Sequence, residues 1–175
     1  MGKNEKNLVS KNFGRISFVT LMVVSALMVF GGQSAYAEAI VATDNNSGVQ
    51  CKILFADHTI DAGRVCAEVV GDNLEITFST SGAWKLEEAH LWIGGNLGDI
   101  PQTRQGNPKI GNFPYKSGDI TGATNHTFQV PLNNLGIYSD VNKGNSDFYV
   151  AAHAALRKID SIGNVIQTES GWAER

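Results

Sequence analysis

Glu88 and His90 are two side chains that could together bind a metal ion or move a proton. They stand two residues apart in a segment, 84–93, that is predicted to be a strand. Successive side chains of a strand point to opposite faces, so this spacing places both on one face together with Leu86 and Trp92.

Two further side chains could complete a site around this pair. His153 lies in a run of small residues that would let another group approach its ring, and Glu169 precedes Trp172 on a predicted neighbouring strand. Imidazole and carboxylate groups together bind zinc or a similar ion, which would allow a metal-binding protein or a metal-dependent hydrolase. The alternative is a partly buried hydrogen-bonded network that fixes strand register, because buried charges require partners.

A second candidate ion site is the segment 140–147. Asp140, Asn142 and Asp147 offer oxygen ligands around Gly144, which resembles part of a calcium loop. The spacing is shorter than in an EF-hand, and the bidentate glutamate that closes such a loop is missing. A plain turn that leads into the next strand is the alternative.

Four aromatic residues could form a platform for sugar rings. They adjoin predicted turns or strand ends, and stacking on a sugar requires an exposed ring face. The alternative is core packing, because a small domain needs large apolar side chains in its interior. The four are Trp84, Trp92, Tyr115 and Trp172.

Common catalytic signatures are missing. The sequence has no Gly-x-Ser-x-Gly elbow, no phosphate-binding loop, no His-Glu-x-x-His motif and no Cys-x-x-Cys pair. This pattern favours a non-catalytic protein that binds a surface polysaccharide, a protein partner or its own copies, without a firm cofactor beyond the calcium or zinc considered above.

The first 37 residues are typical of a cleavable export signal. Basic residues precede an uncharged apolar run over 16–30, and small residues follow it. Cleavage is predicted between Ala37 and Glu38, which implies a secreted protein, extracellular or periplasmic. An uncleaved anchor is the alternative, but the run is shorter than the roughly 20 residues that usually span a bilayer, and no membrane span is expected after processing.

The charge of the remaining 138 residues argues against nucleic acid as a partner. Four of the 14 basic and one of the 17 acidic residues lie in the signal, which leaves ten bases, sixteen acids and a net charge near −6. Binding to a phosphate backbone needs a basic surface. The length suits one domain with one core.

Both cysteines lie after the signal, where an oxidising compartment lets a disulfide persist. A hairpin that turns at His58 and Thr59 would place Cys51 opposite Cys66. A reduced pair is the alternative, and the spacing matches no zinc pattern. We expect the disulfide.

The strand pattern predicts an antiparallel β-sandwich of about seven strands over 49–175, after a flexible leader at 38–48. The clearest strand is 74–79, whose alternation is typical of one buried face. Glycine, proline and asparagine recur over 94–122, which we interpret as one long loop. Short strands with turn signals and no amphipathic helix favour this fold class.

Six phrases occur in an order that resembles a β-rich module of secreted and surface-exposed microbial proteins. The resemblance spans about 49–175 and implies an exported β-rich fold, but the family offers no established catalytic residues that could be assigned to this sequence. Similar modules often continue with another strand, whereas this chain stops at Arg175, so an open edge there could support self-association. The phrases are HTIDAG (58–63), WKLEEAHL (84–91), FPY (113–115), VPL (130–132), YVAAHA (149–154) and ESGWAE (169–174).

Overall fold

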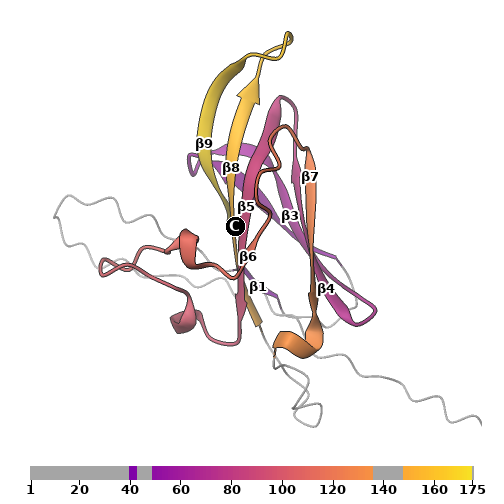
Figure 1. Ribbon diagram of the computed structural model, residues 1–175, viewed down its shortest axis with the longest axis vertical. Coiled ribbons are helices and arrows are strands. Elements are labelled where there is room, and N and C mark those ends of the chain that lie inside the picture. The colour runs from indigo at the N-terminus through magenta and orange to yellow at the C-terminus, as the bar shows by residue number, and fades with distance from the viewer. Residues whose placement is uncertain (1–39, 43–48, 136–147, 175) are drawn as a thin grey trace, which may run out of the picture.

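The computed structural model describes residues 40–42, 49–135 and 148–174, which form one antiparallel β domain (Figure 1). The described part contains nine strands and three short 3-10 helices, η1 to η3. In chain order these are β1 (Ile40–Ala42), β2 (Gln50–Ala56), β3 (Ile60–Val70), β4 (Asn73–Thr80), β5 (Trp84–Gly94), η1 (Leu97–Asp99), η2 (Ile110–Asn112), β6 (Tyr115–Lys116), β7 (Asn125–Pro131), η3 (Leu132–Leu135), β8 (Phe148–Ile159) and β9 (Val165–Glu174).

All of these strands belong to one sheet that winds until it is nearly closed. Its order is β6-β5-β8-β9-β2-β3-β4-β7, and β1 pairs with β8. The segment before β7 links the two ends, because Leu86 pairs with Ala123 and the Thr80 amide donates to the carbonyl of Thr124 at 2.8 Å. The predicted antiparallel all-β class is confirmed, with one continuous sheet around the core in place of two separate sheets.

The interior of this sheet holds the alternating apolar residues that the sequence predicted. Leu74, Ile76 and Phe78 of β4 have no solvent exposure. The ring of Phe78 meets that of Phe128 on β7 edge to face, with centroids 6.0 Å apart, an arrangement that aromatic pairs favour. The clearest strand in the sequence therefore supplies the centre of the core.

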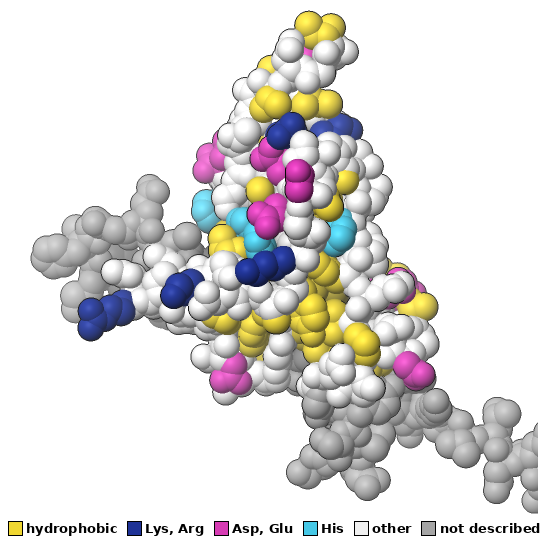
Figure 2. Space-filling view, in the orientation of Figure 1, with side chains coloured by type: hydrophobic (Ala, Val, Ile, Leu, Met, Phe, Trp, Pro, Cys, Tyr) yellow, Lys and Arg dark blue, Asp and Glu magenta, His cyan; other side chains and the backbone are white. Residues whose placement is uncertain are grey.

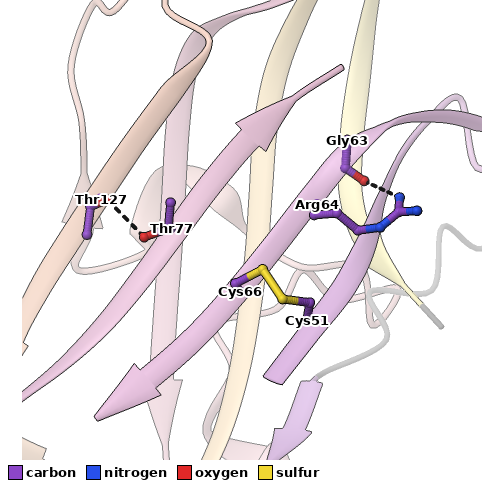
Figure 3. The surroundings of a disulfide bond; sticks show 6 residues. All are labelled: Cys51, Gly63, Arg64, Cys66, Thr77 and Thr127. Carbon is purple, nitrogen blue, oxygen red and sulfur yellow. Dashed lines mark hydrogen bonds between the residues drawn. A yellow bond between two sulfur atoms is a disulfide. The ribbon is translucent and has the colours of Figure 1, made fainter. Parts of the chain in front are cut away.

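The β2–β3 hairpin carries the disulfide. Asp57 and His58 have positive φ angles of 46° and 59°, as both central residues of a type I′ hairpin turn require. The pairing of β2 with β3 shifts by one residue between Leu54 and Phe55, where Ala62 is extra. This bulge places Cys51 directly opposite Cys66, and a disulfide joins them (Figure 3). The predicted bridge is confirmed.

A β-bulge in β5 changes which residues share a face. Leu86 pairs with Leu156 but Glu88 pairs with Ala155, so Glu87 is an extra residue in the strand. An inserted residue reverses the alternation beyond it. Leu86 consequently lies in the main core with no exposure, on the face opposite Trp92. The prediction that these two share a face is wrong.

The segment predicted as one long loop, 94–122, contains regular structure. It includes η1, η2 and β6, and β6 pairs with β5. Ile100 and Phe113 from this segment are buried in a second, smaller apolar cluster with Trp92 and Trp172. The segment therefore covers the outer face of β5, β8 and β9 at one end.

Several predictions fall on the N-terminal part of the chain. The signal and the cleavage site between Ala37 and Glu38 lie outside the described residues. Of the predicted leader, Ile40–Ala42 forms β1 and pairs with β8. No helix in the described ranges has the length and hydropathy needed to cross a membrane.

Candidate functional site

Three neighbouring strands bring two histidines and a tryptophan into one row on the outer face of the sheet. His90 of β5 pairs with His153 of β8, which pairs with Trp172 of β9. The histidine rings lie 5.7 Å apart between centroids, and the His153 ring meets that of Trp172 edge to face at 4.8 Å. These three side chains therefore lie next to one another on the face of the sheet that is turned away from the main core.

His153 is the more buried of the two histidines. Its exposed fraction is 6%, and its Nε2 shares a hydrogen bond with the Oγ of Ser170, 2.8 Å away. Burial, together with a smaller effect of the nearby charge on His90, lowers the pKa of His153 to about 4. At neutral pH its ring is therefore uncharged.

The predicted set of two histidines and two glutamates does not converge. His90 Nε2 lies 3.3 Å from Glu88 Oε1, so this half of the set meets. Glu169 comes one residue before Ser170, so its side chain lies on the opposite face of β9. It accepts a hydrogen bond from Gln167 Nε2 at 2.9 Å. In the described part of the chain, no group of three or more His, Cys, Asp or Glu could hold a metal ion.

The contact between Ser170 and His153 has the atoms of a nucleophile and a base, but the surroundings differ from a catalytic triad. In a triad a carboxylate binds the second ring nitrogen and orients the base. Here Nδ1 of His153 is buried without a hydrogen-bond partner among the described residues. Since its pKa is also far below neutrality, His153 would be a weak general base.

The other predicted ligand sites are absent or outside the structure. Asp140, Asn142 and Asp147 lie outside the described residues. The three tryptophans are buried, with exposed fractions of 4% for Trp84 and 7% for both Trp92 and Trp172, and Tyr115 packs against the main core. The tryptophans fill apolar clusters, so they do not form the predicted sugar platform.

The N-terminal half of β9 has a strand on one side only, as far as the described residues show. The C-terminal end of β9 pairs with β2 over 171–174, and its pairing with β8 extends to Trp172. The N-terminal half of β9, 165–169, lies beyond the β2–β3 turn, and among the described strands it pairs only with β8. This half of β9 is therefore the open edge.

The turn between β8 and β9 holds its shape through Asp160. Its Oδ1 accepts hydrogen bonds from the amides of Ile162 and Asn164 at 2.9 and 2.8 Å, and its Oδ2 accepts one from Asn164 Nδ2 at 3.0 Å. The hydrogen bonds, first of all from the Asn164 side chain, lower the pKa of this carboxyl. The turn is thus fixed by an ionised side chain at neutral pH.

Exposed apolar side chains gather on this hairpin. The structure describes five large exposed hydrophobic residues, and three of them lie here: Ile162 at 82%, Ile166 at 59% and Val165 at 47%. The hairpin projects beyond the rest of the sheet (Figure 1), and hydrophobic atoms cover its tip (Figure 2). We call the turn and the open half of β9, residues 160–169, the hairpin surface.

Sequence reasoning missed Ser170 and the hairpin surface. Ser170 is two residues from Trp172 and so shares its face, a signal that was present once the strand was recognised. The apolar residues at 165 and 166 fit an ordinary strand, and Ile162 lies in the predicted turn before it. Their exposure follows from where β2 ends, which depends on pairing between distant segments.

Comparison with protein-family models, with curated proteins and with solved structures gives no match for this chain. Function is therefore inferred from the geometry.

Proposed function

We propose that this chain is an exported, non-catalytic binding protein, and that the hairpin surface is where it binds a protein partner outside the cytoplasm. The observation that carries the proposal is the concentration of exposed apolar side chains beside an open strand edge on one projecting hairpin. Contiguous apolar surface on a folded domain is typical of a binding site.

Two observations support export. The first residues have the pattern of a cleavable signal. The disulfide joins Cys51, which is exposed, to Cys66 on the neighbouring strand. Disulfides persist in oxidising compartments and are rare in the cytosol, so the bridge fits a protein that works outside it.

The burial of the tryptophans supports a protein as ligand in preference to a polysaccharide. Sugar rings are recognised on exposed aromatic faces, and Trp84, Trp92 and Trp172 are all more than nine-tenths buried. An open edge, in contrast, presents backbone donors and acceptors that an extended polypeptide satisfies by adding a strand. Exposed isoleucine and valine side chains beside the edge add apolar contact.

The rigidity of the tip also supports binding. Asp160 fixes the turn through three hydrogen bonds, one of them from the backbone amide of Ile162, so the backbone that carries the Ile162 side chain is ordered before a partner arrives. Preorganised side chains lose less conformational entropy on binding, which raises affinity.

The proposal predicts that the protein recovered from an exporting culture binds to whole cells of the producing strain through surface proteins. Replacing two isoleucines, Ile162→Ser with Ile166→Ser, should weaken binding about tenfold or more, because burial of apolar surface supplies much of the affinity. Binding of the labelled protein to cells is the measurement. Val70→Ser, at an exposed position on β3, is the matched control and should bind like the unchanged chain.

Pretreatment of the cells distinguishes the two classes of ligand. Protease should remove most of the binding, and glycosidases should leave it intact. Binding that survives protease, or that the double variant retains in full, would contradict the proposal.

A further inference from the structure

We infer that one partner of the hairpin surface is a second copy of this chain, which pairs its own open β9 edge antiparallel to the first across a two-fold axis at Gln167. This inference rests on the proposed role of the hairpin surface and names its partner. Two identical open edges each supply the donors and acceptors that the other lacks, which a symmetric pair satisfies.

The backbone groups available for this pairing follow from the known contact with β2. The Ser170 carbonyl accepts a hydrogen bond from the Asp57 amide at 3.2 Å, so the backbone groups of Ser170 point away from β8. Antiparallel ladders alternate, so those of Thr168 point the same way and those of Gln167 and Glu169 point to β8. Thr168 therefore presents an N–H and a C=O to an incoming strand.

The contact with β2 also fixes the register. Because Asp57 already occupies the position beside Ser170, a second strand can occupy only 165–169, whose middle residue is Gln167. Antiparallel pairing about this residue places Gln167 opposite its symmetry mate and Thr168 opposite Ile166 of the other copy. The exposed Ile166 side chain thereby gains a cross-strand neighbour.

The charges of the segment are compatible with a second copy. Glu169 is the one ionisable residue in 165–169, and this register places it opposite Val165 of the other copy. The two Glu169 positions are then four residues apart along the ladder, or about 13 Å. That separation exceeds a physiological Debye length of about 8 Å, so like charges do not oppose the pairing.

The other ends of the sheet carry features that hinder strand addition. β7 ends in Pro131, and its outward residues, such as Thr127 and Gln129, are polar. β6 has two residues and includes Lys116. Proline, lysine, β-bulges and short length are the usual protection of strand edges. The segment 165–169 has neither proline nor lysine, and its one irregularity is the bulge that leaves Ile166 without a partner on β8.

The first test is sedimentation of the full protein over a range of concentrations. A strand pair this short is below a standard interface in size, so we expect a reversible dimer with a dissociation constant on the order of 100 μM. Thr168→Pro removes an N–H that points away from β8, so the fold should persist while the dimer is lost. A monomer at every concentration up to about 1 mM would overturn the inference, as would unchanged dimerisation of a folded Thr168→Pro variant.

The second test, cross-linking, does not depend on the proline variant. Gln167→Cys should give a disulfide-linked dimer on mild oxidation, because directly opposed residues of a non-hydrogen-bonded pair lie within disulfide reach. Ser161→Cys is the control, since Ser161 is exposed but far from the proposed axis. Equal cross-linking of the two variants, or none by Gln167→Cys, would overturn the inference.

The outcomes separate this inference from the proposed function. A chain that binds cells through the hairpin surface but stays monomeric refutes the second copy alone. A chain that dimerises as described but does not bind cells refutes the cell-surface partner alone.

Discussion

Replacing both cysteines, Cys51→Ser with Cys66→Ser, is expected to lower the free energy of unfolding by about 3 kcal/mol. The bridge closes a loop with a sequence separation of 15 residues, and its loss restores conformational freedom to the unfolded chain. In the native protein β2 and β3 remain paired with each other and with β9 and β4, so the loss falls mainly on the unfolded state. Urea denaturation of the unchanged protein and the double variant measures the difference.

Reduction of the unchanged protein provides the control. Cys51 is exposed, so a thiol reductant reaches the bridge and should lower the stability by a similar amount. The double variant should not respond to the reductant. Equal stability of the oxidised protein and the double variant would contradict this account of the bridge.

Lowering the pH from about 6.5 to 4 is expected to remove up to about 3 kcal/mol of stability through His153 alone. Burial lowers the pKa of His153 to about 4 in the folded protein, and an unfolded histidine titrates near 6.5. Between these values the unfolded chain binds the proton and the folded chain does not, so acid favours unfolding. The folded protein therefore has its full stability with respect to His153 above pH 6.5, and it loses that stability as the pH falls toward 4.

Variants at two histidines isolate this effect. His153→Gln should flatten the pH dependence of stability between pH 6.5 and 4. Glu88 and His90 still lie near position 153 in this variant, so the variant removes the contribution of His153 alone. His126→Gln is the matched control, because burial also lowers the pKa of His126 but this residue is much less buried. A steep pH dependence that survives in His153→Gln would show that another group carries it.

The parts of the fold that sequence predicted are those with local signals. Strict alternation identified β4, and the turn signal after Ala56 placed the two cysteines on paired strands, although their direct opposition also depends on the bulge at Ala62. The bulge at Glu87 has no such signal, because one extra polar residue in a strand changes neither composition nor length noticeably. β6 has two residues, too few to show any period.

The site was predicted in part for similar reasons. The sequence placed Glu88 and His90 on one face, and they lie together. Glu169 stands an odd number of residues from Trp172, so strand alternation alone places them on opposite faces, a signal that the prediction did not use. The position of the open edge depends on where β2 stops beside β9, which no local pattern records.

Amide hydrogen exchange along β9 tests the central claim, that 165–169 is an open edge which a second strand covers, most directly. In dilute solution the Thr168 amide should exchange rapidly while the amides of Gln167 and Glu169, which face β8, are protected. At high protein concentration the Thr168 amide should become protected as well. Strong protection of Thr168 in dilute solution, or no change with concentration, would contradict the claim.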